Sequence, residues 1–268
     1  MKKEMLRRRY SQRTIESYLF CIEKFLSSVT KHPRKITKKD IKDYLDCLAL
    51  KDRAGSTLNI HLCSIKFLLE EVLRRNIHLR MKYSRKPKTL PVVLTKNEVK
   101  RFFAAVKNPK HSLMVQLMYS AGLRLSELLN LKARDLEFEN NFGWIRHGKG
   151  NKDRAFILAE KLKKRILEFA GMHKLGPDDF LFKGIKRAHM HPRSVQEIVR
   201  KAAKKARIMK NVHPHTLRHS FATHLIENGS RIIEVQSLLG HSSIETTRTY
   251  LHTANVRLIS VKSPLDSL

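Results

Sequence analysis

The chain has 268 residues, 41% of them hydrophobic, with 55 lysines and arginines against 24 aspartates and glutamates, a formal net charge of +31 at pH 7. This length and apolar content suffice for one large or two ordinary domains. With no apolar run near ~20 residues and no secretory leader at the N-terminus, we expect neither a membrane-spanning nor a secreted protein, and a cytoplasmic location. The excess of positive charge favours a polyanionic partner, first of all nucleic acid, over a charged surface that binds nothing.

The three cysteines show no CxxC spacing, so we expect buried, reduced thiols rather than disulfides or a zinc site: Cys21, Cys47 and Cys63.

Residues 11–75 have the apolar spacing of three amphipathic helices joined by short loops. Ser11 stands at the start of the first helix. Thr37 with Asp40 has the pattern of a capping box for the second, and Gly55 separates the second from the third. The sequence therefore predicts a small helical bundle in this part of the chain.

A basic segment with two prolines and no hydrophobic periodicity follows the bundle. Such a segment is typical of an extended linker, and its positive side chains are expected to lie along phosphates. We therefore expect an N-terminal helical domain at 1–81, a linker at 82–91 and a second domain at 92–268. The cations expected to contact DNA are Lys82, Arg85, Lys86 and Lys88.

The second domain is predicted to be mostly helical with a small antiparallel sheet. Thr95 with Glu98 resembles a capping box for its first helix, and Ser194 with Glu197 for a later one. Short strand-like runs occur at 136–139, 143–146 and 155–158, and helical patterns at 113–122, 159–171, 194–207, 215–228 and 231–239. A further short helix, capped by Ser242, is expected to carry Tyr250.

Arg124 lies where one predicted helix ends at Gly122 and the next begins. Backbone amides and the positive end of a helix dipole favour an anion at such a junction. Glu127, three residues further on, is positioned to support the arginine from behind. The alternative interpretation is a helix-turn-helix over 113–136 in which Arg124 merely touches DNA.

His215 and Arg218 are three residues apart and share a helical face. A guanidinium can donate two parallel hydrogen bonds to a phosphate, so Arg218 is a candidate phosphate clamp. The pair His215 and His219 also has the spacing of a zinc site, but the glutamate of H-E-x-x-H and a third ligand are lacking, so no metal is expected. His219 and His224 are interpreted as structural.

Lys149 is flanked by glycines between two strand signals, at the expected tip of a hairpin. It is either a solvated side chain or an ammonium that protonates a departing 5′ oxygen. Tyr250 has polar neighbours on most sides, in 246–252. A tyrosine becomes a nucleophile at neutral pH only where cations or a base help to remove its proton, and is otherwise a packing residue.

Five short motifs occur in one order along the chain, and together they resemble the tyrosine recombinases (the phage integrase family). The likeness is greatest to the Xer type and, in the ending 262–266, to its archaeal XerA branch, and it covers nearly the whole chain. The motifs are Gly122-Leu-Arg-Leu-Ser-Glu127, Gly148-Lys-Gly-Asn-Lys152, His215-Thr-Leu-Arg-His219, Leu239-Gly-His241 and Tyr250.

The resemblance implies a SAM-like helical core-binding domain, an α/β catalytic domain and a role for each motif. Tyr250 would attack the scissile phosphate and form a 3′-phosphotyrosyl bond. Lys149 would protonate the leaving oxygen, His215 would take the proton of the tyrosine, and Lys152 would contact DNA. The groups that would stabilise the charge on the phosphorane are Arg124, Arg218 and His241.

The resemblance also implies four subunits on two DNA sites, a subunit that is monomeric when free, a C-terminal tail that docks on a neighbour, and no cofactor. Resolution of chromosome or plasmid dimers is the expected role. An integrase of a mobile element or virus is the alternative, disfavoured because only about ten residues precede the first predicted helix. A DNA-binding protein without catalysis is the remaining class. It would leave Tyr250, His215 and Lys149 without a function.

Overall fold

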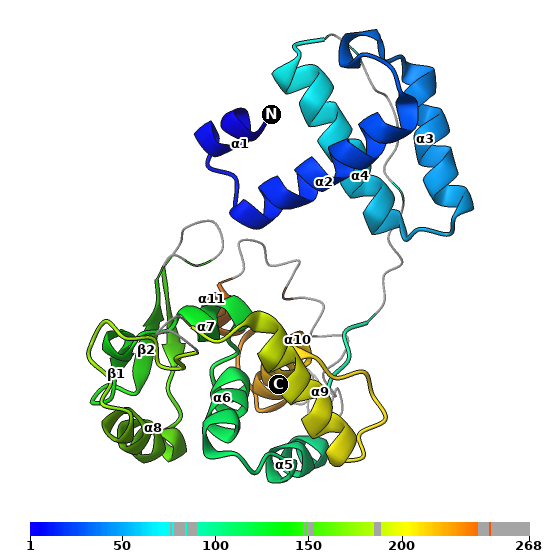
Figure 1. Cartoon of the computed structure of the whole chain (residues 1–268). Helices are drawn as coiled ribbons and strands as arrows, with labels where there is room; N and C mark the ends of the chain where they lie inside the picture. The colour runs from blue at the N-terminus through cyan, green and yellow to red at the C-terminus, as the bar shows by residue number, and fades with distance from the viewer. Residues whose placement is uncertain are drawn as a thin grey trace, which may run out of the picture. The chain divides into compact units, whose positions relative to one another are not determined.

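The computed structural model describes residues 1–75, 77, 84, 90–146, 148, 153–184, 189–240 and 247. The chain divides into two compact units, Met1–Lys88 and Thr89–Leu268. The first is helical, and the second combines helices with a three-stranded sheet (Figure 1). The expected fold class, mainly helical with a small antiparallel sheet, is thus confirmed. Of the linker expected at 82–91, only residues 84, 90 and 91 are described.

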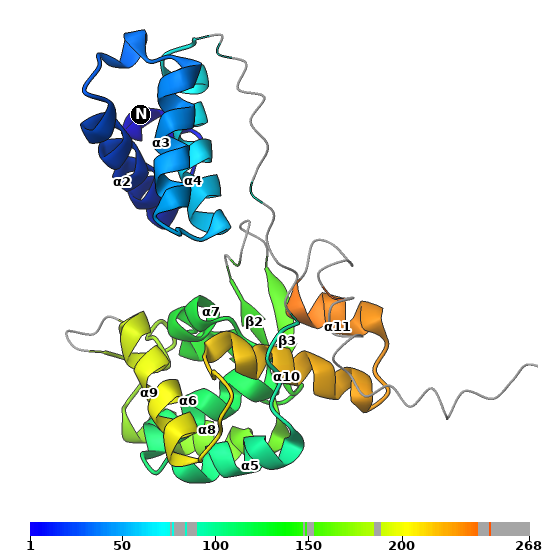
Figure 2. The same cartoon turned by 90° about the vertical axis from the view of Figure 1, so that its right-hand side faces the viewer.

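Three long helices form the body of the first unit and run alongside one another (Figure 2). Their apolar faces enclose a core in which Phe25, Ile41 and Ile65 are fully buried. The elements are α1 (Lys2–Arg7), α2 (Gln12–Val29), η1 (Pro33–Lys35), α3 (Lys38–Leu50), α4 (Gly55–Lys66) and η2 (Phe67–Val72), a π-helical continuation of α4.

The local signals in this unit acted largely as expected. The Ser11 side chain accepts a hydrogen bond from the Thr14 amide at 3.2 Å, and Thr37 with Asp40 forms the predicted capping box. Helix α1 was not expected from the sequence; it is only six residues long and buries Met5 alone. So short a helix has little hydrophobic periodicity to detect.

The second unit begins with a helix capped as predicted by Thr95 and Glu98. The cap predicted at Ser194 is wrong: the His191 side chain accepts a hydrogen bond from the Arg193 amide, and Pro192 occupies the first turn. The helices are α5 (Lys96–Ala105), α6 (Pro109–Ser120), α7 (Leu125–Asn130), η3 (Ala133–Asp135), α8 (Glu160–Met172), α9 (Pro192–Lys205), α10 (Pro214–Glu227) and α11 (Ile232–Leu239).

The sheet has the order β1-β2-β3, with strands at Leu136–Glu137, Phe142–Ile145 and Arg154–Ile157, all antiparallel. The pairing of β2 with β3 places Ile145 opposite Arg154 and Gly143 opposite Phe156. Alternation along β3 puts Arg154 and the buried Phe156 on one face. The expected hairpin tip, with Lys149, lies outside the described residues.

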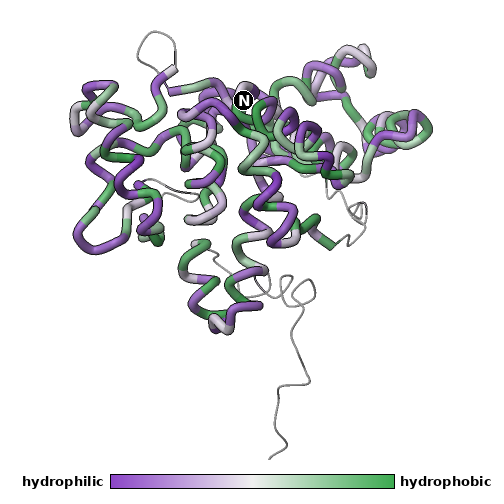
Figure 3. Tube along the Cα trace, turned by 90° about the horizontal axis from the view of Figure 1, so that it is seen from below, coloured by the Kyte–Doolittle hydropathy of each residue, from purple (hydrophilic) through white to green (hydrophobic). Residues whose placement is uncertain are grey.

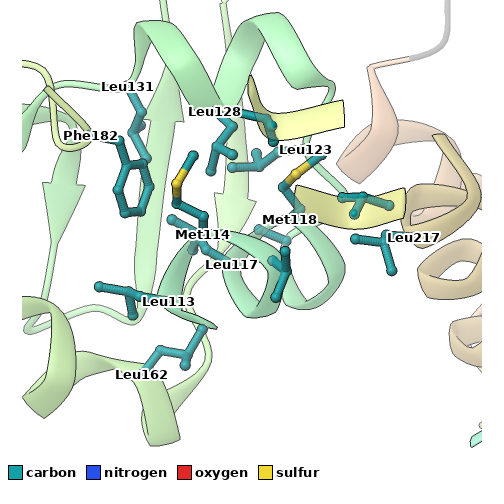
Figure 4. Packing of buried hydrophobic residues seen from close by; sticks show 14 of the residues in the cluster. Leu113, Met114, Leu117, Met118, Leu123, Leu128, Leu131, Leu162, Phe182 and Leu217 are labelled. Atoms are coloured by element: carbon teal, nitrogen blue, oxygen red, sulfur yellow. The ribbon is translucent and has the colours of Figure 1, made fainter. Parts of the chain in front are cut away.

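The core of the second unit is built around α6, whose residues Leu113, Met114, Leu117 and Met118 are buried among side chains of the neighbouring helices (Figure 4). Hydrophilic and hydrophobic residues alternate along the helices (Figure 3). This alternation is the pattern of helices that bury one face and solvate the other.

The segment that enters the second unit is fastened to α10 and to the loop that precedes it. The Leu94 amide donates to the Ser220 hydroxyl at 2.9 Å, and the Lys210 ammonium donates to the Val93 carbonyl at 2.9 Å. One turn beyond Ser220, Nδ1 of His224 is hydrogen-bonded to the Tyr119 hydroxyl at 2.8 Å. These contacts give His224 a structural place, as the sequence interpretation had it.

In the described part of the chain, no helix is long and apolar enough to cross a bilayer. None of the three cysteines, all of which are described, forms a disulfide. Cys21 is buried as expected, whereas Cys47 is exposed on the outer side of α3, which corrects the expectation of three buried thiols.

Candidate active site

Helix α10 brings His215, Arg218 and His219 to one side of the second unit, because residues three and four apart share a helical face. Pro214 stands in the first turn. The His213 side chain caps the helix by accepting a hydrogen bond from the Thr216 amide at 3.3 Å. The start of the helix, and with it His215, is therefore fixed by local interactions.

The Arg218 side chain is only 3% exposed. Its Nη1 donates to the Gly122 carbonyl at 2.5 Å and its Nη2 to the Leu239 carbonyl at 2.6 Å. Gly122 follows α6 with a φ of +58°, and Leu239 is the last residue of α11. A cation at the carbonyl ends of two helices is favourable, and this one joins both of them to α10.

Arg124 lies immediately before α7, and Glu127 lies in the first turn of that helix. The Arg124 side chain, 19% exposed, donates from Nη1 to Oε1 of Glu127 at 2.5 Å. The Arg124 amide donates to Oε2 of the same carboxylate at 2.8 Å. Glu127, 4% exposed, thus contacts both the side chain and the backbone amide of Arg124.

Two further arginines converge on this carboxylate. Oε2 of Glu127 lies 2.6 Å from Nη2 of Arg154, at the start of β3, and 3.7 Å from Nη1 of Arg218. We call Arg124, Arg154, Arg218 and Glu127 together the Glu127 cluster. Three guanidiniums and one carboxylate leave it with two positive charges in excess.

The pKa of Glu127 lies below its ordinary value although burial by itself would raise it. The charge of Arg154, the hydrogen bond from the Arg124 amide and the charge of Arg124 outweigh the effect of burial. Glu127 is therefore ionised at neutral pH, and the four charges of the cluster are all present.

His215 is also affected by this cluster. Partial shielding from water lowers its pKa, and the nearby His213, Arg218 and Arg124 lower it further, with Glu127 acting in the opposite direction. Because its pKa is lowered, the imidazole of His215 is neutral at pH 7. The residue as a whole remains exposed, so the imidazole is open to solvent. A neutral, accessible imidazole can accept a proton.

His219 has a different environment. Its ring lies 6.3 Å from that of His215, and burial, followed by the charges of His215, His213 and Arg218, lowers the pKa of His219 to about 4. It is neutral at all ordinary pH values. This fits the structural interpretation of His219 and not a role as a proton donor.

Of the residues singled out from the sequence, the structure brings together Arg124, Glu127, His215 and Arg218. The remaining candidates lie outside the described residues: Lys82, Arg85, Lys86, Lys88, Lys149, Lys152, His241 and Tyr250. Arg154 was missed. Its one sequence signal is the strand alternation that places it on the same side as Phe156, which is buried.

The arrangement has the properties of an anion site with a base at its edge. Guanidiniums held by hydrogen bonds on their inner side keep a fixed orientation, which suits them to stabilise negative charge as it develops on a phosphate. Because His215 is neutral, it adds a proton acceptor and no further charge.

Comparison with known families gives matches over both units. Residues 92–257 match the model described as the phage integrase family, and residues 1–79 match that of the phage integrase N-terminal SAM-like domain. The chain is 35% identical over 261 residues to a tyrosine recombinase of Thermosipho africanus, covering 92% of this chain and 91% of that relative. It is 34% identical over 243 residues to the tyrosine recombinase XerA of Pyrococcus horikoshii, covering 90% and 83%.

Solved structures show the same fold. The crystal structure of XerA recombinase aligns with a TM-score of 0.57 at 32% identity, over 94% of this chain and 91% of that one. The XerH site-specific recombinase bound to a palindromic difH substrate, in a post-cleavage complex, aligns with a TM-score of 0.77 at 24% identity, over 91% and 77%.

Proposed function

We infer that this chain, a member of the phage integrase family of tyrosine recombinases and therefore of a class of DNA strand-transferases, is a site-specific recombinase that cuts and rejoins DNA through a 3′-phosphotyrosyl intermediate. One observation carries the inference: Arg124, just before α7, and Arg218, in α10, meet at one buried carboxylate near the neutral His215. A phosphodiester under attack needs these two properties of a site, fixed positive charge and a proton acceptor.

In the proposed reaction Tyr250 attacks the scissile phosphorus, and its hydroxyl proton passes to His215. Negative charge builds up on the nonbridging oxygens, where Arg124, Arg218 and His241 stabilise it. The bond to the 5′ oxygen breaks, and Lys149 supplies the proton that this oxygen needs. A 5′-hydroxyl from another duplex then attacks the phosphotyrosine and restores a phosphodiester, so the bond energy is kept and no cofactor is required.

The DNA partner is supported by the net charge of +31. We propose that residues 1–81 form a core-binding domain and residues 92–268 the catalytic domain. The linker 82–91, with Lys82, Arg85, Lys86 and Lys88, and Lys152 of the catalytic domain would contact phosphates. The relatives whose structures align include recombinases solved on DNA. Two sites and four subunits are the proposed assembly, formed from subunits that are monomeric when free.

The finer role that we propose is resolution of chromosome or plasmid dimers in the cytoplasm, in support of chromosome partition and cell division. The support is the 34% identity to the archaeal XerA. Integration of a mobile element is the alternative, because putative integrases/recombinases of Sinorhizobium fredii are 33% identical to this chain. Selection of bound fragments from genomic DNA separates the two: one chromosomal site favours dimer resolution, and element ends favour integration.

The test of the reaction uses a nicked suicide duplex that carries a selected site. Wild-type protein should form a covalent adduct with the DNA, and Tyr250→Phe should form none while it still binds DNA. Tyr10→Phe is the matched control, because Tyr10 packs against Phe67 in the first unit and has no proposed role in the reaction. An undiminished adduct with Tyr250→Phe, or no adduct with the wild type on any selected site, contradicts the proposal.

A further inference from the structure

Arg154 is the one arginine of the Glu127 cluster without a role in the proposed reaction. It begins β3, and its side chain is 9% exposed, less than that of Arg124. An arginine buried to this degree requires partners, since the cost of removing its charge from water is large. Its partners therefore indicate why it is placed there.

One end of the guanidinium contacts the carboxylate that supports Arg124. Nη2 of Arg154 donates to Oε2 of Glu127 at 2.6 Å. That oxygen also accepts the Arg124 amide, while Oε1 accepts the Arg124 side chain. Arg154 therefore fixes the rotation of the Glu127 carboxylate, and the carboxylate in turn fixes Arg124.

The other end of the guanidinium contacts the end of α11. Nη1 of Arg154 donates to the Leu238 carbonyl, next to the Leu239 carbonyl that accepts Nη2 of Arg218. Gly240 follows with a φ of +59°, and a Cβ built there would lie 2.6 Å from Cδ of Arg154. The arginine thus packs against the turn from which the chain continues to His241.

We infer that Arg154 is a positioning residue of the phosphate site, in which one buried guanidinium holds the carboxylate behind Arg124 in register with the end of α11 that binds Arg218. The inference rests on the proposed function. It follows from the geometry that a lysine cannot replace this residue. A single ammonium keeps the charge that Glu127 needs but lacks the planar fork that reaches two acceptors at once.

The experiment measures single-turnover formation of the covalent adduct by Arg154→Lys over a range of protein concentrations. The rate at saturation should fall roughly 10- to 100-fold, the usual effect of losing a group that orients a catalytic group. The concentration at half-saturation should stay within about threefold of wild type, because the lysine keeps the positive charge of this position and so the electrostatic attraction to DNA.

Arg165→Lys is the matched control. Arg165 is also part-buried in the second unit and donates to Gln116 at 2.5 Å and to Ser112 at 3.3 Å, away from the Glu127 cluster. Both of its kinetic constants should stay within about threefold of wild type. Each protein is assayed well below its melting midpoint, and Arg154→Gln provides a second variant should the lysine variant be unstable.

A methylphosphonate at the scissile position distinguishes positioning from general weakening of the fold. This substrate lacks one nonbridging negative charge and so depends less on oriented arginines. On this substrate the rate of the Arg154 variants should therefore fall short of the wild-type rate by a severalfold smaller factor. A merely unstable protein would show the same loss of rate on both substrates.

The outcomes separate the two proposals. If wild type forms the Tyr250-dependent adduct and a folded Arg154 variant reacts within threefold of it at saturation, the role of Arg154 is refuted and the recombinase assignment stands. An equal deficit on both substrates likewise refutes positioning. If wild type forms no adduct, the proposed function fails, and the role of Arg154 fails with it.

Discussion

Replacing Glu127 by glutamine should destabilise the second unit strongly. The carboxylate is 4% exposed and balances Arg124, Arg154 and Arg218. An amide of nearly the same volume removes the negative charge and leaves three buried or half-buried guanidiniums facing one another. Breaking a buried ion pair from one side costs about 3–5 kcal/mol. For a domain of roughly 150–250 residues, a loss of this size lowers the melting midpoint by roughly 6–20 °C.

The pH dependence of this loss provides an internal check. Because the pKa of Glu127 is lowered in the folded protein, its stabilising effect is fully present above its ordinary value of 4.5. The effect is lost as the pH falls through the folded pKa. The difference between wild type and Glu127→Gln should therefore be largest near pH 7 and shrink below pH ~4.

Chemical and thermal denaturation of the full chain measure the effect. Glu197→Gln is the control, since that carboxylate pairs with Arg200 on the exposed face of α9 and should leave the midpoint close to that of wild type. The double variant Arg154→Met with Glu127→Gln should recover part of the stability, because it removes one of the stranded charges. A Glu127→Gln protein within about 1 kcal/mol of wild type at pH 7 would refute the reasoning.

Three further predictions follow from individual positions. Because the pKa of His215 is lowered and its neutral form is the base, the rate of adduct formation should stay level down to pH ~6.5 and decline only below it. A pH–rate profile with its midpoint above pH ~7 contradicts this prediction. With a folded pKa of about 4 for His219, the unfolded chain binds its proton more readily, so stability should fall by at most about 3 kcal/mol between pH ~6.5 and ~4. In denaturant titrations His219→Gln should show a smaller decline of the free energy of unfolding with falling pH. If that free energy declines in parallel for wild type and variant, the prediction is refuted. Gly122→Ala should lower the free energy of unfolding by about 2–5 kcal/mol, since φ is +58° and the added Cβ would lie 2.4 Å from the Phe221 ring. Gly171→Ala, whose added Cβ has no atom within 4 Å, should raise the free energy of unfolding by about 0.5–1 kcal/mol. The reverse order of stability in chemical denaturation would refute this reasoning.

The sequence predicted best what is decided locally. The capping boxes at Thr37 and Thr95 depend on residues three apart, and both form. Ser194 has the same pattern and fails, because Pro192 two residues earlier is a stronger first-turn residue and moves the start of the helix. The helix α1, with one buried side chain, left no periodicity to detect.

The residues proposed to act on the phosphate could be predicted from the sequence, and the residue that supports them could not. Arg124, Arg218 and His215 belong to short motifs that can be recognised along the chain. The contact of Arg154 with Glu127 joins residues 27 positions apart, and its contact with Leu238 spans 84 positions. Only tertiary structure brings these segments together, so neither propensity nor spacing could reveal that three arginines share one carboxylate.

This shared carboxylate has a consequence for how the protein can evolve. Substituting Glu127 alone strands a buried positive charge, and substituting Arg154 alone deprives the carboxylate of a buried cation that lies 2.6 Å away. A lineage that changes either position should therefore pass through a less stable intermediate or change both together. Among related sequences the two positions should covary, while Arg124, constrained by the reaction as well, should remain fixed as they change.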